Sequence, residues 1–97
     1  MQIYIVNWSS ISSEDQIFAT KEFCNSFREG KIENHFNECE LINCYHMPQD
    51  GTGVIICKTK DLKSLYKILK PWRDNFNLIF NIKPALTNEE LLEINNI

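Results

Sequence analysis

Two segments of the chain carry apolar side chains at consecutive positions, whereas a strand with one solvent-exposed face would alternate apolar with polar residues. The first is residues 2–8, QIYIVNW, and the second is the run VIIC at positions 54–57. Because neighbouring side chains of a strand point to opposite faces, both segments predict strands that are covered on both faces. The fold of this chain must therefore supply cover for two sides of one sheet.

Turn and helix signals divide the rest of the chain. Pro48-Gln49-Asp50-Gly51 predicts a hairpin turn, since Asp-Gly accepts the left-handed backbone angles that such a turn needs. Gly30 predicts the end of the first helix, and Pro71 ends or kinks the second. Residues 31–38 predict no more than a short extra helical turn. The predicted strands are 2–8, 39–46, 52–59 and 76–83, and the predicted helices are 13–29, 61–70 and 88–97.

The helix starts and their apolar stripes are also visible in the sequence. Ser13 with Gln16, and Thr87 with Glu90, match the capping-box pattern, and Asp61 is a capping residue for the second helix. Apolar residues at helical spacing predict one core-facing stripe on each long helix. The stripes are Ile17, Thr20, Phe23, Cys24 and Phe27 in the first helix and Leu62, Leu65, Leu69 and Trp72 in the second.

The order of these elements, β-α-β-β-α-β, is the split βαβ pattern of ferredoxin-like folds. A chain of 97 residues suits one α+β domain, residues 1–97, with an antiparallel sheet and its helices on one face. The other face would be an exposed apolar patch of a kind that monomers rarely tolerate. We therefore predict a homodimer that packs sheet on sheet, with the segment after Ile82 reaching across to the partner.

Composition limits the classes of partner. Ten basic and thirteen acidic residues give a net charge of −3, which argues against nucleic acid, because a nucleic-acid binder usually carries a basic surplus. No apolar run approaches the roughly 18–20 residues of a membrane span, and the N-terminus lacks the basic start of a signal peptide. We predict a cytoplasmic protein with no membrane partner. Its four cysteines lack a C-x-x-C spacing, which favours reduced core thiols over a metal or cluster site.

Motifs along nearly the whole chain carry a family resemblance. The strongest are Pro71-Trp72-Arg73-x-x-Phe76 and residues 82–90, IKPALTNEE. Weaker matches are Val6-Asn7-Trp8, Phe23-Cys24, Glu40-Leu41-Ile42, residues 46–53 (HMPQDGTG) and Ile56-Cys57-Lys58. On these residues the chain resembles a small family of unknown function that is frequent in marine picocyanobacteria. The resemblance implies a dimeric α/β barrel, whose better-known relatives include cofactor-free monooxygenases, haem-degrading enzymes and stress-response proteins.

The haem-degrading relatives combine a first-strand Asn, a Trp and a His that ligates the iron, which draws attention to Asn7, Trp72 and His46. In those relatives the His lies on the second helix, and residues 61–70 here contain none. His46 instead ends the second predicted strand. The haem ligand therefore does not carry over, and we predict no cofactor.

His46 is the best single polar candidate, since an imidazole can act as acid, base or ligand near neutral pH. It can equally cap the strand by hydrogen bonding to the backbone or a carboxylate. Gln49, in the turn that follows, can line the mouth of a cleft or simply build the turn. His35, Glu38 and Cys39 form only a weak metal-ligand pattern, and we predict no metal site.

Trp72 and Arg73 form a second candidate group. Arg73 can fork onto the carboxylate of an acidic ligand held against Trp72. In the structural alternative Trp72 fills the core and Arg73 pairs with a nearby acid. A row of lysines at helical spacing, Lys60, Lys63, Lys67 and Lys70, predicts a basic and solvated side of the second helix.

Three functions remain open from the sequence. One is a stress or regulatory protein that acts through the lysine row of the second helix. Another is a non-catalytic dimeric module that binds a small molecule or a protein. The alternative is a cofactor-free monooxygenase or isomerase, with His46 as proton carrier and Asn7, Trp8, Tyr45 and Trp72 orienting a small apolar substrate. An apolar cavity of about 300 Å³ or more with His46 pointing into it would favour the enzyme, and a filled core with His46 on the surface would exclude it.

Overall fold

The computed structural model describes residues 1–36 and 38–96 and confirms the predicted fold class. Among the described elements, only the short helix α2, between α1 and β2, is added to the predicted β-α-β-β-α-β order with its C-terminal helix. The strands are β1 (Gln2–Ser9), β2 (Cys39–Met47), β3 (Thr52–Thr59) and β4 (Ile79–Ala85). The helices are α1 (Ser13–Arg28), α2 (Lys31–His35), α3 (Leu62–Phe76) and α4 (Asn88–Asn95).

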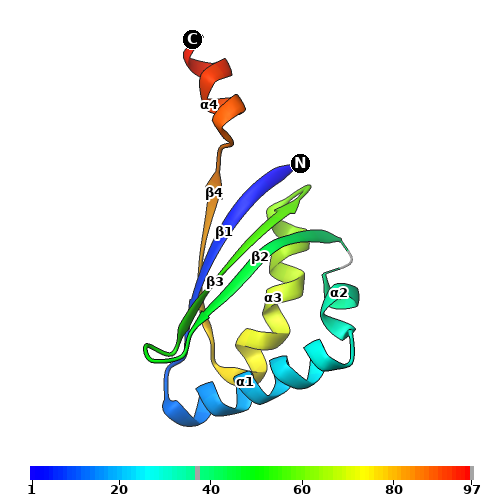
Figure 1. The fold of residues 1–97 in the computed structure, drawn as a ribbon, viewed down its shortest axis with the longest axis vertical. Helices are drawn as coiled ribbons and strands as arrows, with labels where there is room; N and C mark the ends of the chain where they lie inside the picture. The colour runs from blue at the N-terminus through cyan, green and yellow to red at the C-terminus, as the bar shows by residue number, and fades with distance from the viewer. Residues whose placement is uncertain (37, 97) are drawn as a thin grey trace.

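The four strands form one antiparallel sheet in the order β2-β3-β1-β4. Helices α1, α2 and α3 all lie on one side of this sheet (Figure 1). We call the side that carries these helices the inner face and the opposite side the outer face. The hairpin between β2 and β3 turns at Gly51, which has the left-handed angle (φ 67°) expected of the Asp-Gly pair.

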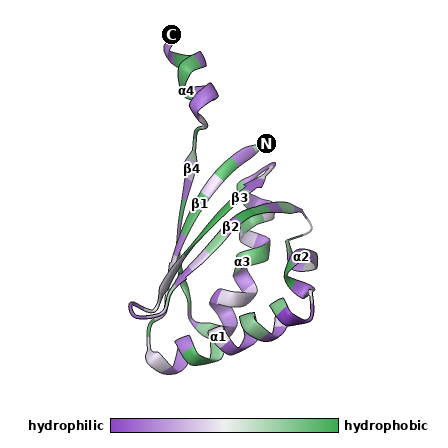
Figure 2. Ribbon diagram, in the orientation of Figure 1, coloured by the Kyte–Doolittle hydropathy of each residue, from purple (hydrophilic) through white to green (hydrophobic). Residues whose placement is uncertain are grey.

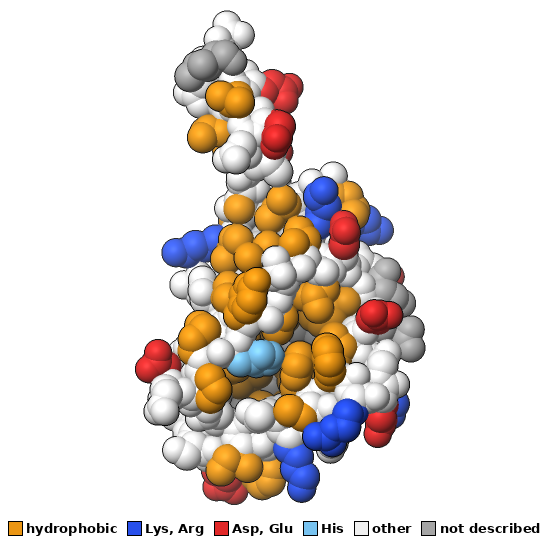
Figure 3. Space-filling model, in the orientation of Figure 1, with side chains coloured by type: hydrophobic (Ala, Val, Ile, Leu, Met, Phe, Trp, Pro, Cys, Tyr) orange, Lys and Arg blue, Asp and Glu red, His pale blue; other side chains and the backbone are white. Residues whose placement is uncertain are grey.

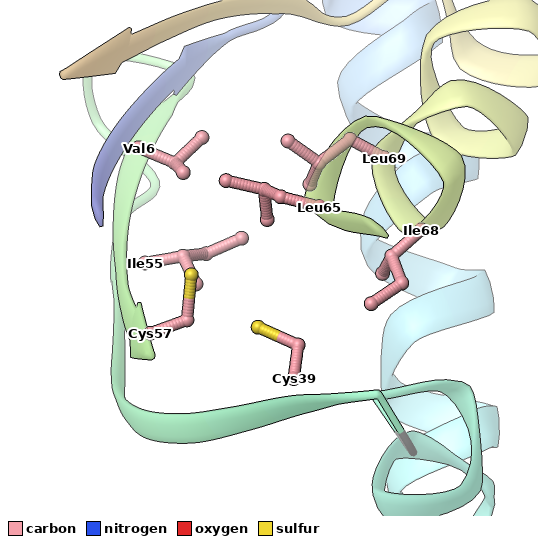
Figure 4. Close-up of a cluster of buried hydrophobic side chains, with 7 residues drawn as sticks. All are labelled: Val6, Cys39, Ile55, Cys57, Leu65, Ile68 and Leu69. Atoms are coloured by element: carbon pink, nitrogen blue, oxygen red, sulfur yellow. The ribbon is translucent and has the colours of Figure 1, made fainter. Parts of the chain in front are cut away.

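The core lies between the inner face and α3. Strand register places Val6 of β1 between Ile55 of β3 and Ile82 of β4, so that their side chains share the inner face. From α3, Leu65 and Leu69 meet them, and both are almost fully buried. Figure 4 shows the side chains of this cluster converging between the sheet and α3, with the sulfur atoms of the two buried cysteines among them. Its buried members are Val6, Cys39, Ile55, Cys57, Leu65, Ile68 and Leu69.

Helix α1 differs from its prediction in its start and in its buried face. Ser12, not Ser13, is the capping residue, and its hydroxyl accepts from the Asp15 backbone N–H at 3.1 Å. Along the predicted stripe, Ile17 is 65% exposed and Phe27 is 68% exposed. The reason is that α1 packs mainly against α2 and α3 and not against the sheet, so Ala19 is the only described residue of this helix that is buried.

Helix α3 runs through Pro71 to Phe76, beyond the predicted end. Asn77 takes left-handed angles (φ 55°) and its N–H bonds to the Arg73 carbonyl, which ends the helix there. Phe76 is therefore helical, β4 starts only at Ile79, and Pro84 lies within the strand. Leu62 is 50% exposed, because it lines an open groove between the start of α3 and the inner face of β1 and β4. The Asp61 cap is confirmed, since its carboxylate accepts from the Ser64 N–H at 2.8 Å.

Helix α4 confirms the predicted Thr87–Glu90 capping box, in which both reciprocal hydrogen bonds are present. It stands beyond the end of β4, away from the body of the domain (Figure 1). Green apolar and purple polar stretches alternate along it in Figure 2. None of its described residues is buried. No helix in residues 1–36 and 38–96 is both long and apolar enough to cross a membrane.

Candidate functional site

A cavity of about 230 Å³ lies between the inner face of the sheet and helices α1 and α3. Its walls are mainly apolar and aromatic. Figure 3 shows a hollow on this side of the molecule, with histidine atoms among hydrophobic side chains. The lining residues that matter for the argument are Trp8, Phe23, Cys44, His46, Trp72 and Phe80.

One row of the sheet builds the floor of the cavity. Trp8 of β1, Gly53 of β3 and His46 of β2 are neighbours across the three strands, and all three face inward. A Cβ atom on Gly53 would lie 2.2 Å from Trp8 Cε2, far inside van der Waals contact. Gly53 is therefore required for the indole to lie flat across β3 and to approach His46, whose ring centroid is 5.8 Å away.

Aromatic rings from α1 and α3 close the cavity opposite this floor. The Phe23 ring lies edge-on to the His46 ring, with centroids 4.7 Å apart, and 6.3 Å from the Trp72 ring. Phe23 sits on the face of α1 that also carries Thr20 and Cys24, which line the same cavity. The helical stripe of the sequence therefore becomes a cavity wall more than a packed core.

Hydrogen bonding fixes the orientation of Trp72. Its indole N–H donates to His35 Nε2 at 2.9 Å, and the Ile68 carbonyl lies 3.0 Å from the same nitrogen. Nε2 can accept from the indole only when the ring proton is on Nδ1, and it then has no proton to donate to the Ile68 carbonyl. His35 thus acts as a support for the cavity wall from the short helix α2, a role that the sequence did not suggest.

His46 presents a neutral imidazole to the cavity. Its Nε2 lies 3.6 Å from Cys44 Sγ, and among the described residues no carboxylate hydrogen-bonds to it. Partial burial lowers the pKa of His46 below its ordinary value of 6.5, so the ring is unprotonated at neutral pH. Burial also raises the pKa of the Cys44 thiol, which disfavours the reactive thiolate. The pair can accept a proton from a ligand, but it lacks the third group that would orient a catalytic base.

Polar groups gather at the hairpin end of the cavity. The Gln16 side-chain amide donates to the Pro48 carbonyl at 2.8 Å and so ties α1 to the β2–β3 turn. Ser10 holds the same turn through its backbone N–H, which bonds to the Gly51 carbonyl at 2.8 Å. The buried Ser10 hydroxyl has no hydrogen-bond partner in the part of the chain that the structure describes.

The structure brings three of the predicted site residues together, namely Trp8, His46 and Trp72. Asn7 and Tyr45 point to the outer face instead, since their register partners are Val54 and, for Asn7, also Asn81. The remaining two lie elsewhere on the surface. Gln49 is exposed in the hairpin turn, and Arg73 is exposed on α3.

Arg73 follows the structural alternative. It pairs with Asp74 at 3.3 Å and lies over the Tyr66 ring, 5.5 Å from its centroid. His35, Glu38 and Cys39 do not converge. In the described residues no group of three or more His, Cys, Asp or Glu side chains is placed to hold a metal ion.

Sequence reasoning missed several contributors to the cavity, among them Ser10, His35, Cys44, Gly53 and, as a wall residue, Phe80. Cys44 is two positions before His46 and Gly53 faces both Trp8 and His46. The spacing of Cys44 was a usable signal, because residues two apart on a strand share a face. The pairing of Gly53 was not visible without the strand register.

Comparison with known proteins identifies the family and supports the fold. Residues 2–96 match the family described as "Domain of unknown function (DUF3303)". The chain belongs to this family. No curated protein matches the DUF3303 chain. A solved structure of a candidate antibiotic biosynthesis monooxygenase from Deinococcus radiodurans is similar, with a TM-score of 0.53 and 15% identity over 91% of this chain and 93% of that chain. At this identity the similarity shows the ferredoxin-like fold alone.

Proposed function

We propose that this DUF3303 protein is a homodimeric module that binds a small, uncharged and mainly apolar molecule in the inner-face cavity. The observation that carries the proposal is the cavity itself, about 230 Å³ in volume and walled by Trp8, Phe23, Trp72 and Phe80. An apolar cavity of roughly 150 Å³ is enough to bind benzene. The volume here therefore suits a ligand of about ten non-hydrogen atoms.

The electrostatics of the walls favour an uncharged ligand. No Lys, Arg, Asp or Glu is among the described residues that line the cavity. A charged ligand would lose its hydration without gaining a partner, which is costly in an apolar site. His46 can donate or accept one hydrogen bond, and this suits a single hydroxyl or carbonyl on the ligand.

Binding can be tested with small probes such as indole, ethylbenzene and 1-octanol, titrated by calorimetry and followed by amide chemical shifts. Ala19→Met places a longer side chain into the cavity from the buried position on α1. Lys21→Met, two residues along the same helix and not in the lining, is the matched control. We expect A19M to weaken binding at least tenfold and K21M to leave it unchanged. Equal binding of the probes by both variants, or no binding by the wild type, would contradict the proposal.

The homodimer rests on the outer face of the sheet. Ile3, Ile5, Val54 and Ile56 form its centre, and Tyr45 at 55% exposure and Ile79 at 56% extend it. A two-fold partner that packs the same face against it would cover these side chains. The patch is larger and more contiguous than the isolated apolar residues that a monomer usually leaves in water.

Light scattering behind size exclusion should report twice the 11.4 kDa of one chain at micromolar concentration. Tyr45→Asp should shift the population to monomers, because it places a charge in the proposed interface. Ile17→Asp, on a similarly exposed apolar residue of α1, should not. A wild-type monomer would exclude the dimer and leave the ligand site to be judged by the titration.

A cofactor-free monooxygenase or isomerase is the second candidate, and the specific observation in its favour is His46. A neutral imidazole in an apolar cavity can take the acidic proton of a bound substrate, the step with which either reaction begins. The fold of the candidate monooxygenase from Deinococcus radiodurans is consistent with this chemistry. Oxygen uptake with a small dihydroxyaromatic such as catechol tests the monooxygenase. Uptake that His46→Gln abolishes supports this activity, and uptake that is no faster than with H46Q contradicts it.

A further inference from the structure

The hydroxyl of Ser10 is buried at the hairpin end of the inner-face cavity. Among the described residues it is the only buried side-chain nitrogen or oxygen that has no hydrogen-bond partner. A buried hydroxyl without a partner is destabilising, and most buried polar groups of native proteins do have one. Ser10 is also one of the residues that line the cavity. An occupant of the cavity can therefore supply the partner that the chain does not.

Gln16 presents an amide oxygen at the same end of the cavity. A Cβ atom on Gly51 would lie 3.2 Å from Gln16 Oε1 and 3.8 Å from Ser10 Cβ, so both side chains flank this glycine. The amide nitrogen of Gln16 is used on the Pro48 carbonyl, which fixes the orientation of the amide. This end of the cavity thus offers one hydroxyl that can donate and one amide oxygen that can accept. A ligand hydroxyl matches both groups, whereas a carbonyl can only accept.

His46 lies at a different point of the same cavity. It shares a row of the sheet with Trp8 and Gly53, and Ser10 follows two positions beyond Trp8 on the hairpin side. Strands about 4.8 Å apart, with a rise of about 3.3 Å per residue, put the Cα atoms of Ser10 and His46 roughly 12 Å apart. A molecule of about ten non-hydrogen atoms can bridge this distance, because a hydrogen bond of about 2.8 Å extends it at each end.

We propose that the ligand of the cavity is an aromatic alcohol with a phenolic hydroxyl at one end of its ring and an alcohol hydroxyl at the other. The phenolic hydroxyl donates to His46, and the rings of Trp8 and Phe23 cover the ligand ring. The alcohol hydroxyl donates to Gln16 Oε1 and accepts from Ser10 Oγ, which turns about χ1 toward it. This turn breaks no hydrogen bond within the described residues. The inference rests on the proposed function and adds a second polar contact to it.

Two probes of nearly the same shape test the second contact. Para-hydroxybenzyl alcohol carries both hydroxyls, and in para-ethylphenol a methyl group replaces the alcohol hydroxyl. Their Kd values are measured by calorimetry with the wild type, with Ser10→Ala, and with the control Ser9→Ala, whose position faces the outer side of the sheet. Comparing the ratio of the two Kd values between chains cancels the different hydration of the probes. We expect S10A to raise the Kd of para-hydroxybenzyl alcohol relative to that of para-ethylphenol about fivefold, and S9A to leave the ratio unchanged.

The outcomes separate this inference from the proposed function. If the wild type binds neither probe, both are overturned. If para-ethylphenol binds and S10A leaves the ratio unchanged, the proposed function is kept and the contact with Ser10 is overturned. Thermal unfolding checks the variant itself, because removing a hydroxyl without a partner should leave Tm unchanged or raise it. A lower Tm of S10A would show that the hydroxyl is already bonded within the chain, and this would also overturn the inference.

Discussion

Gly53 is the position where one added carbon should disturb the candidate site most directly. In Gly53→Ala the new Cβ would lie 2.2 Å from Trp8 Cε2 and Cζ2. Carbon atoms in contact are about 3.5 Å apart or more, so the indole must move by roughly 1.3 Å. Phe80 pairs with Trp8 from the other side and limits that movement. Overpacking of this kind costs about 1–3 kcal/mol, partly offset by about 0.5–1 kcal/mol for replacing Gly in a strand.

We therefore expect G53A to lose about 1–2 kcal/mol, which for a domain of this size lowers Tm by roughly 4–16 °C at fixed protein concentration. Trp8→Ala provides the decisive background. With the indole removed, the clash is gone and only the strand preference remains, so Gly53→Ala should become neutral or stabilising there. Thermal unfolding followed by circular dichroism measures all four chains of this cycle. The same loss of stability with and without Trp8 would refute the argument from the clash.

Three further predictions concern other parts of the site. Trp72→Phe keeps a ring in the wall but removes the N–H that donates to His35. It should lower the free energy of unfolding in urea by about 0.5–1.5 kcal/mol. If His35→Ala costs the same in the wild type and in the Trp72→Phe background, the two side chains are not coupled. Burial lowers the pKa of His46, so the unfolded chain binds more protons than the folded chain around and below pH 6.5. The free energy of unfolding should therefore be highest above that pH and fall as the pH drops toward the lowered pKa. A His46→Gln profile as steep as that of the wild type over this window would contradict the prediction. Burial raises the pKa of Cys57 to about 12 and Cys39 is also buried, so at pH 8 a disulfide reagent should react rapidly with exposed Cys24 and reach Cys39 and Cys57 only on unfolding. Cys44 is partly exposed, so the control is the double variant Cys24→Ser, Cys44→Ser, in which a surviving rapid phase would show otherwise.

Much of the fold could be predicted because local chemistry and global topology agree in this chain. The Asp50-Gly51 turn, the Asp61 cap and the Thr87–Glu90 box are short-range signals whose physics is complete within a few residues. Strand β3 was predicted at its observed bounds, since its apolar run is flanked by turn residues on both sides. The order of the elements then restricted the topology to the split βαβ pattern.

The errors fall where two local signals compete. Residues 76–83 alternate as a strand should, yet Phe76 and Asn77 complete a helix that continues through Pro71. The strand-like alternation holds from Leu78 onward, and only the left-handed backbone angle of Asn77 decides where the helix ends. The exposure of Ile17 and Phe27 had a different cause, because helical spacing predicts a shared face but not which element packs against that face.

The composition of the candidate site depends on an irregularity that no periodicity reveals. In β2 the register shifts between Leu41 and Asn43, so the chain contains one extra residue, Ile42, at this point. Before the bulge Cys39 and Leu41 face inward, and strict alternation from them would carry Tyr45 to the inner face and His46 to the outer one. The extra residue reverses the parity and gives the cavity His46 and Cys44 while Tyr45 joins the outer face. One inserted position thus assigns two adjacent aromatic side chains to two different tasks, a neutral proton acceptor inside and an apolar contact for the proposed partner outside.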